Sequence, residues 1–213
     1  MSVIKIDPAN PDKRKIAIAA KVIKEGGLVV FPTETVYGVA TNFFDIKAMK
    51  RLCSAKARPE GKPFTVHIAD IKMIRNTGCS ITGAAKKLMA EFWPGPLTII
   101  LKSRNGKKIG FRMPADKIAL ELIRRSGVPV AASSANLSGR PAPVTVEEAM
   151  ADLEGRIDIV IDGGRTKVGL ESTVVDLAAD PFKVLRVGAI KEEELSKAIN
   201  GQYKFHSFCL HRE

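Results

Sequence analysis

The chain has 213 residues, of which 45% are hydrophobic and 27% charged, a composition typical of one globular domain with a well-buried core. Lys and Arg outnumber Asp and Glu by 34 to 23, and the net charge of +11 favours polyanionic partners such as nucleotides or RNA. No segment approaches the roughly 20 apolar residues of a membrane span, and the N-terminus has no apolar signal core, so we expect a cytoplasmic protein without membrane association. Cys53, Cys79 and Cys209 form no Cys-x-x-Cys pair, which favours reduced thiols over a zinc site or a disulfide framework.

Helices are predicted where a capping residue precedes apolar residues at helical spacing. The first begins with Asn10 as its cap and Pro11 at the first helical position, and Gly26-Gly27 end it. Asp45 and Asp116 are predicted to cap two later helices. The other predicted helical segments are residues 71–75, 82–92, a segment opened by the capping box at 145–148, and 192–199.

Strands are predicted where short apolar or alternating runs lie between breakers. They are residues 28–31, 64–68, 97–101, 109–112, 128–131, 157–161, 172–177 and 184–187. Because helices and strands alternate without a repeat or a linker, we expect one α/β domain over residues 1–200, with a twisted, open, mixed sheet and flanking helices. Residues 201–213 lack periodicity, and we expect a tail that is either disordered or folded over a site.

The standard phosphate-binding loops are absent, since the chain has neither a Gly-x-x-x-x-Gly-Lys-Ser/Thr nor a Gly-x-Gly-x-x-Gly motif. Phosphate chemistry would therefore depend on side chains. Lys56 and Arg58 are two residues apart after a predicted helix, so an extended backbone would point both to the same side, as a phosphate clamp requires. Alone, a Lys-x-Arg pair is more typical of a solvated loop.

Polar side chains follow two of the predicted buried strands. Ser134 and Asn136 offer a hydroxyl and an amide on alternate residues after 128–131, which suits phosphate or ribose oxygens. Thr33 presents a hydroxyl after 28–31, where Pro32 fixes the backbone. Taken singly, each cluster is more typical of a turn.

Four further residues are candidates with equally ordinary alternatives. Arg112 and Arg186 can hold a carboxylate or phosphate with two hydrogen bonds, or can form surface ion pairs. His67 lies on the polar face of the strand at 64–68, where a hydrogen-bonded structural histidine is more common than a functional one. Ser172 can place a small hydroxyl against a ligand at the start of a strand.

Together, eight ordered segments resemble the YrdC-like family, and the resemblance extends over residues 3–190. The segments are Pro32-Thr-Glu-Thr-Val-Tyr-Gly38, Lys56-x-Arg58-Pro59, His67, Trp93-Pro-Gly-Pro-Leu-Thr98, Arg112-x-Pro114, Ser134-Ala-Asn-x-Ser-Gly139, Glu171-Ser-Thr-Val-Val-Asp176 and Arg186-x-Gly188.

The resemblance implies a large basic cavity on one face of the sheet. It also implies a nucleotidyltransferase that makes threonylcarbamoyl-AMP from L-threonine, bicarbonate and ATP and releases pyrophosphate, for the threonylcarbamoyl modification of tRNA. ATP would be a substrate accompanied by Mg²⁺, no cofactor would stay bound, and the tRNA threonylcarbamoyl-transfer machinery would receive the product. Longer members add a C-terminal domain, so the chain resembles the short form.

The resemblance also assigns roles by position in the motifs. Lys56, Arg58, Ser134 and Asn136 match residues associated with catalysis and ATP, and Arg186 matches a nucleotide-binding arginine. Thr33, His67, Arg112 and Ser172 fall where the family binds L-threonine. Charge grows on the phosphate oxygens during adenylate formation, so Lys56 and Arg58 are expected to act as an electrostatic clamp.

An alternative from another class is a protein that binds double-stranded RNA or tRNA through the same basic concavity without adenylation, as proposed for YciO-type relatives. Net charge supports both. The complete Lys56-x-Arg58 and Ser134-x-Asn136 set favours the synthase. A third possibility, a tRNA-editing hydrolase, lacks the expected metal-ligand spacing, and no metal ligands are predicted.

Overall fold

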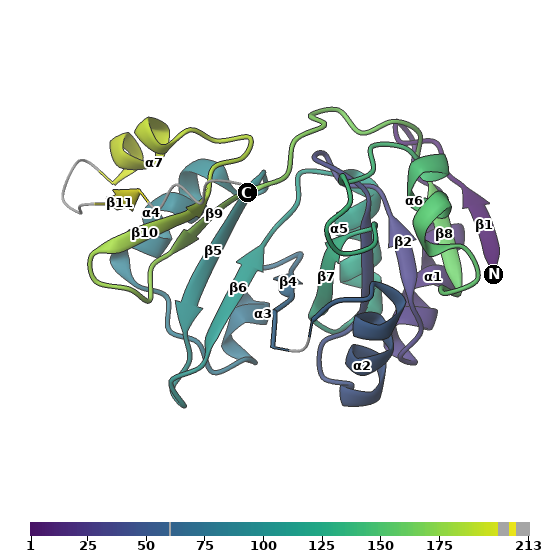
Figure 1. Ribbon diagram of the computed structural model, residues 1–213, viewed down its shortest axis with the longest axis horizontal. Helices are drawn as coiled ribbons and strands as arrows, with labels where there is room; N and C mark the ends of the chain where they lie inside the picture. The colour runs from purple at the N-terminus through teal and green to yellow at the C-terminus, as the bar shows by residue number, and fades with distance from the viewer. Residues whose placement is uncertain (60, 200–204, 208–213) are drawn as a thin grey trace.

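The computed structural model describes residues 1–59, 61–199 and 205–207. Within them, the strands form one mixed eleven-stranded sheet in the order β1-β8-β2-β3-β7-β4-β6-β5-β9-β10-β11 (Figure 1). The strands are β1 (Ser2–Lys5), β2 (Val29–Phe31), β3 (Gly38–Asn42), β4 (Thr65–His67), β5 (Leu97–Lys102), β6 (Lys108–Arg112), β7 (Val130–Ser134), β8 (Ile159–Asp162), β9 (Thr173–Asp176), β10 (Phe182–Arg186) and β11 (Phe205–Ser207). The predicted open α/β sheet is confirmed.

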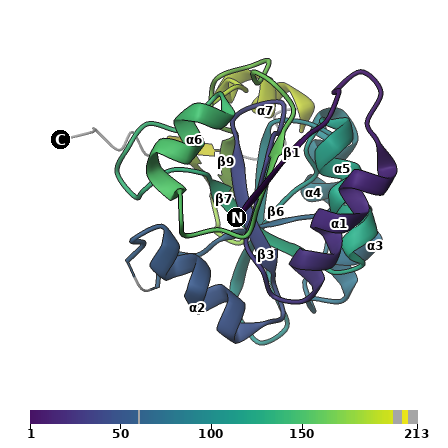
Figure 2. The same cartoon turned by 90° about the vertical axis from the view of Figure 1, so that its right-hand side faces the viewer.

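Helices cover both faces of the sheet (Figure 2). Two of them, α2 (Ile46–Ala55) and α6 (Val146–Leu153), lie on one face. On the other face lie α1 (Lys13–Lys24), α3 (Lys72–Arg75), α4 (Gly83–Phe92) and α5 (Lys117–Ser126). The last helix, α7 (Glu192–Ala198), packs into the same core as α4. In the described part of the chain, no helix is both long and apolar enough to cross a membrane.

Three predicted helix starts are confirmed by their capping hydrogen bonds. Asp45, Asp116 and Thr145 each accept a bond from the backbone N–H three residues later, at 3.0, 2.9 and 3.3 Å. Such bonds satisfy backbone donors that have no partner within the helix.

The predicted start of the first helix is wrong. Asn10 does not cap it, because the Asp12 carboxylate accepts from the backbone N–H groups of Arg14 (2.8 Å) and Lys15 (3.3 Å). The helix therefore begins at Lys13, and Pro11 lies outside it.

The last strand, β11, lies within the predicted tail of residues 201–213. Phe205–Ser207 pairs in parallel with β10, which the sequence did not predict. The rest of the tail prediction falls on residues 201–204 and 208–213, which lie outside the described residues. Cys209 is one of them. Among the described cysteines, Cys53 and Cys79 are free thiols.

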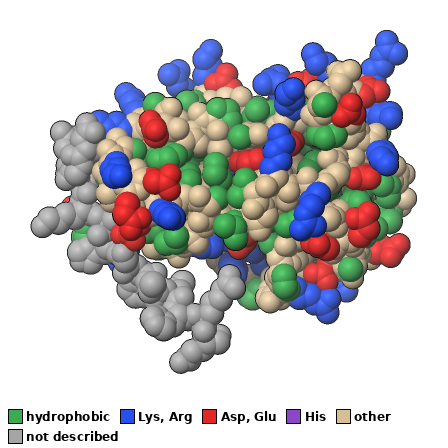
Figure 3. Space-filling view, turned by 90° about the horizontal axis from the view of Figure 1, so that it is seen from above, with side chains coloured by type: hydrophobic (Ala, Val, Ile, Leu, Met, Phe, Trp, Pro, Cys, Tyr) green, Lys and Arg blue, Asp and Glu red, His purple; other side chains and the backbone are tan. Residues whose placement is uncertain are grey.

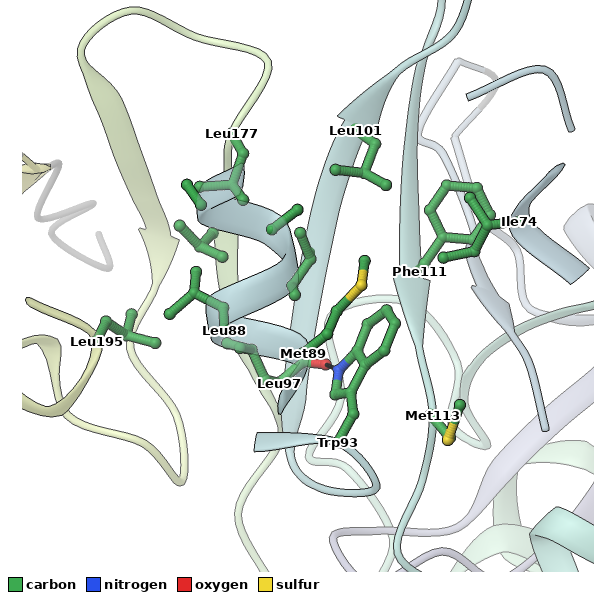
Figure 4. Close-up of a cluster of buried hydrophobic side chains, with 14 of the residues drawn as sticks. Ile74, Leu88, Met89, Trp93, Leu97, Leu101, Phe111, Met113, Leu177 and Leu195 are labelled. Carbon is green, nitrogen blue, oxygen red and sulfur yellow. Dashed lines mark hydrogen bonds between the residues drawn. The ribbon is translucent and has the colours of Figure 1, made fainter. Parts of the chain in front are cut away.

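One hydrophobic core lies between α4 and the strands β5, β6 and β9 (Figure 4). Trp93 packs in it beside Met89, and its indole N–H donates to the Leu97 carbonyl at 2.7 Å. Two further cores involve β2, β3, β7 and β8, one with α1 and α5 and the other with α2 and α6. Apolar residues thus fill one face of β5, β6 and β9, and their other face is free to form a site.

The connection between β8 and β9, residues 163–172, crosses from near one edge of the sheet to its distant half (Figure 1). Backbone bonds fix it to the loop between β2 and β3: the N–H of Val168 donates to the Glu34 carbonyl at 2.8 Å, and that of Gly169 to the Thr35 carbonyl at 3.0 Å. The Tyr37 hydroxyl also donates to the Gly164 carbonyl at 2.6 Å. The crossing segment therefore joins the two parts of the sheet.

Candidate functional site

A cavity of about 980 Å³ lies against the sheet. All nine residues predicted from the motifs line it: Thr33, Lys56, Arg58, His67, Arg112, Ser134, Asn136, Ser172 and Arg186. They come from segments more than 150 residues apart in the chain, and the fold brings them together.

Strand alternation explains how the sheet presents polar groups to the cavity. Leu97, Ile99 and Leu101 of β5 are buried in the core, whereas Thr98 and Ile100 between them line the cavity. A strand sends successive side chains to opposite faces, and β6 follows the same rule. Of its residues, Phe111 enters the core, and Lys108, Gly110 and Arg112 line the cavity.

Lys56 is bonded to the segment that carries Ser134 and Asn136. Its ammonium donates to the Ser134 carbonyl, to the Asn136 carbonyl at 2.5 Å and to the Asn136 side-chain oxygen at 3.3 Å. Only 1% of Lys56 is exposed. Burial, followed by the nearby charge of Arg58, lowers the pKa of Lys56 to about 8.

The expectation of an extended backbone from Lys56 to Arg58 is wrong. Lys56 is the C-cap of α2 with helical dihedrals (φ −91°, ψ −2°), and Ala57 has a φ of 47°, in the left-handed region. A turn at the helix end, instead of strand alternation, brings both side chains to the cavity.

Arg58 fixes the loop that follows it. Its Nε donates to the Lys62 carbonyl at 3.1 Å and its Nη2 to the Pro63 carbonyl at 2.6 Å. The guanidinium also lies 4.6 Å from the centroid of the Phe64 ring, in a cation–π contact. Burial lowers the pKa of Arg58, yet a guanidinium stays charged at physiological pH.

Arg112 pairs with a carboxylate that the sequence did not single out. Its Nη2 donates to Glu34 Oε1 and to the Thr35 hydroxyl, both at 2.8 Å, and Glu34 and Arg112 are both buried. Glu34 Oε2 and Arg112 Nε have no hydrogen-bond partner among the described residues. Thr33 lies next to this pair, with its hydroxyl 2.9 Å from that of Thr35.

His67 adjoins Arg112, because β4 and β6 are parallel and these residues are in register. Burial and the charge of Arg112 lower the pKa of His67 to about 3, so the imidazole is neutral at physiological pH. Its Nδ1 is buried and has no hydrogen-bond partner among the described residues. His67 can thus accept or donate a hydrogen bond to a ligand, but it adds no charge.

Ser172 and Arg186, which the resemblance assigns to different ligands, touch each other. Arg186 Nη2 donates to the Ser172 carbonyl at 2.9 Å and to its hydroxyl at 3.2 Å, and Nη1 pairs with Glu171 Oε1 at 2.9 Å. The Ser172 hydroxyl is also 2.9 Å from that of Thr98. The two predicted subsites therefore meet at this pair.

The expected basic cavity is confirmed. Its charged lining residues are Lys56, Arg58, Lys62, Lys108, Arg112, Arg140 and Arg186 against Glu171 and Asp176. On the face shown in Figure 3, Lys and Arg are spread over the surface among Asp and Glu, so the net charge of +11 is not gathered into one patch there.

The sequence does not predict Lys108, which lines the cavity, or Glu34, which pairs with the lining residue Arg112. The strand expected at 109–112 begins at Lys108, and the alternation that places Arg112 in the cavity also places Lys108 there. Lys108 is bonded to Asp176 at 2.7 Å. No local signal marks Glu34, whose partner is 78 residues away.

Comparison with known proteins gives consistent findings. The family profile Sua5_yciO_yrdC, described as "Telomere recombination", matches residues 21–188. Threonylcarbamoyl-AMP synthase of Pyrococcus abyssi is 44% identical over 201 residues, which cover 90% of this chain and 59% of that protein. The synthase of Bacillus subtilis is 42% identical over 203 residues, covering 91% and 59%. The chain thus spans about 59% of the length of these two relatives.

Two solved structures are also similar. The crystal structure of P. abyssi Sua5 complexed with L-threonine superposes with a TM-score of 0.90 at 41% identity, over 96% of this chain and 62% of that one. The crystal structure of Escherichia coli YciO gives 0.81 at 30% identity, over 92% and 100%.

Proposed function

Because the chain belongs to the Sua5/YciO/YrdC family, we propose that it is a threonylcarbamoyl-AMP synthase, which converts L-threonine, bicarbonate and ATP to threonylcarbamoyl-AMP and pyrophosphate. The observation that carries the proposal is the convergence of all nine motif residues on one basic cavity. The similarity to a structure that holds L-threonine supports it.

The threonine end of the cavity is the one formed by Thr33, His67, Arg112 and Ser172. Arg112 holds the substrate carboxylate, for which a guanidinium is well shaped, and Glu34 limits the net charge of this end. Neutral His67 leaves the substrate amine free of a repelling cation, which favours the unprotonated amine that must react.

The nucleotide end is formed by Arg58, Ser134, Asn136 and Arg186 around the phosphates. The threonine amine attacks the carbon of bicarbonate and yields a carbamate and water. A carbamate oxygen then attacks the α-phosphorus, the bond between that phosphorus and the bridging oxygen breaks, and pyrophosphate leaves with the electron pair. Because no covalent enzyme intermediate is needed, the protein acts through in-line positioning and through cations that stabilise the phosphate charge.

Mg²⁺ belongs to this scheme as a companion of ATP. The described residues contain no group of three or more His, Cys, Asp or Glu side chains that could hold a metal, so the phosphate oxygens would supply most of its ligands. When bound, Mg²⁺ would neutralise charge on these oxygens. The scheme uses no permanently bound cofactor, and the product would pass to the tRNA threonylcarbamoyl-transfer machinery in the cytoplasm.

The alternative, an RNA-binding protein without adenylation activity, is not favoured. The named synthases are 44% and 42% identical to this chain, whereas YciO of E. coli is 32% identical.

The test is the formation of product by the purified protein. With isotope-labelled bicarbonate, ATP, L-threonine and Mg²⁺, we expect labelled threonylcarbamoyl-AMP and equimolar pyrophosphate. Ser134→Ala should abolish turnover, whereas Ser196→Ala on α7 should leave it unchanged. A folded wild-type protein that binds both substrates and makes no product would refute the proposal.

A further inference from the structure

All three N–H donors of the Lys56 ammonium are used by protein oxygens, whereas a phosphate clamp needs a free donor. An ammonium has three N–H donors and no acceptor. Three protein oxygens, the carbonyls of Ser134 and Asn136 and the side-chain oxygen of Asn136, are within hydrogen-bond distance of Nζ. With 1% of the residue exposed, no N–H remains for a phosphate oxygen unless one of these bonds breaks.

Further bonds hold the same segment from other sides. The Lys56 carbonyl accepts from the Ser138 N–H at 2.9 Å, and Asn136 Nδ2 donates to the Arg140 carbonyl at 2.5 Å. From α6, Asp152 accepts from the backbone N–H of Leu137 at 2.9 Å and pairs with the Arg140 guanidinium at 2.5 Å. Residues 134–140 thus form a loop tied to α2 and α6, and Lys56 is the cation at its centre.

We infer that Lys56 is a positioning residue: it holds the 134–140 loop so that Ser134 and Asn136 face the nucleotide, and it does not itself contact phosphate. This role deepens the proposed function, on which its ligand-binding consequences rest. It also separates the two cations of the Lys-x-Arg motif, since of these two only Arg58 would contact the phosphates.

The charged surroundings of Lys56 come from several elements. Arg58 and Lys62 in the following loop disfavour the charged form, whereas Glu171 before β9 and Asp152 on α6 favour it. The burial-lowered pKa of about 8 means that the ammonium loses a proton as the pH rises through that value. The neutral amine would direct a lone pair at a carbonyl oxygen, so we expect the loop to loosen above this pH in the wild type.

The first experiment is hydrogen exchange on the ligand-free protein, and its result does not depend on the proposed function. In Lys56→Met, we expect faster exchange across residues 134–140 than in the wild type. Lys62→Met is the matched control, because it removes a cavity-lining ammonium that has no bond to this loop, and exchange there should not change. If Lys56→Met does not fold, Lys56→Gln provides the same comparison.

The second experiment measures affinity. In Lys56→Met, we expect the Kd for ATP to rise about tenfold or more and the Kd for L-threonine to stay within about twofold, since threonine binds at the other end. Because Lys56 would act through Asn136, the double variant Lys56→Met/Asn136→Ala should bind ATP no more weakly than the worse single variant.

The two experiments decide whether Lys56 positions the loop or contacts phosphate. Unchanged exchange in residues 134–140 together with weaker ATP binding would show a direct phosphate contact and overturn the inference. Additive losses in the double variant would overturn it as well. A wild type that binds neither ligand would refute the proposed function, while the exchange result would still decide the role of Lys56 in holding the loop.

Discussion

At the scale of single residues, two buried cations line the cavity, and they differ in the groups that accept their hydrogen bonds. Arg112 has a carboxylate, Glu34, and both are buried. Lys56 has only neutral oxygens as hydrogen-bond acceptors. A carboxylate partner compensates a buried cation far better than carbonyl dipoles do, and the lowered pKa of Lys56 reflects that difference.

His67 gives a prediction about stability and pH. Its pKa is about 3 in the fold and near the ordinary value of about 6.5 in the unfolded chain. Between these values the unfolded chain binds a proton that the folded protein excludes, so the free energy of unfolding falls as the pH falls below about 6.5, by at most about 1.4 kcal/mol per unit. Replacing the histidine with glutamine should remove this contribution.

Urea denaturation of wild type and His67→Gln at several pH values checks this. The difference between their free energies of unfolding should change steadily below about pH 6.5 and stay constant above about pH 7.5. A difference that is the same at every pH would show that His67 has the same pKa in the folded and unfolded states, which would contradict the lowered pKa.

Nine cavity-lining residues could be predicted because they belong to recognisable motifs. Their arrangement in the cavity could not be predicted. Lys56 and Arg58 were expected to share a side through an extended backbone, and Ala57 instead takes a left-handed turn. Glu34 lies in the same motif as Thr33, yet its bond to Arg112 arises only when β6 is packed beside the β2–β3 loop. Such contacts join residues far apart in sequence and leave no local pattern.

At the scale of elements, the segment after β10 is pressed against the segment before β9. A Cβ added at Gly188 would lie 2.1 Å from the Glu171 carbonyl oxygen and 2.7 Å from the Ser172 carbonyl carbon. These are backbone atoms, so neither can rotate away. The close approach keeps Ser172 and Arg186 in contact.

Gly188→Ala should therefore separate Ser172 from Arg186, weaken binding of both ATP and L-threonine and lower the free energy of unfolding by about 1–3 kcal/mol. Calorimetric titration and urea denaturation measure these effects. Gly83→Ala is the control, because no atom lies within 4 Å of its added Cβ, and it should be neutral or up to about 1 kcal/mol more stable. Wild-type affinities in Gly188→Ala would show that the contact does not set this geometry.

Elements with strong local signals were predicted, and elements defined by their neighbours were not. Asp45 and Asp116 predict the starts of two helices because an aspartate there can cap the backbone N–H three residues later. β3 was missed because it is nearly buried between β2 and β7 and so shows no alternation. β7 was placed too early, since its end at Ser134 is polar and is a strand only through pairing with Gly38.

At the scale of the whole molecule, the cavity combines a net charge of +11 with a predominantly basic lining. ATP is a polyanion and L-threonine is a zwitterion, so their affinities should respond differently to salt. Raising the ionic strength from about 0.01 M to about 0.15 M shortens the Debye length from about 30 Å to about 8 Å. Calorimetric titration should show a clear loss of ATP affinity and little change for L-threonine; equal losses would argue against long-range attraction.

The crossing segment between β8 and β9 has a consequence for synthesis on the ribosome. A nascent chain that has emerged only to Asp162 already contains seven of the nine motif residues, but neither Ser172 nor Arg186. β9 pairs with β5, which is synthesised some 75 residues earlier. The part of the cavity lined by Ser172 and Arg186 can therefore form only after this long-range strand pairing. Ligand-binding competence is therefore acquired only after Arg186 has emerged, and L-threonine and ATP can stabilise only chains that have passed that point.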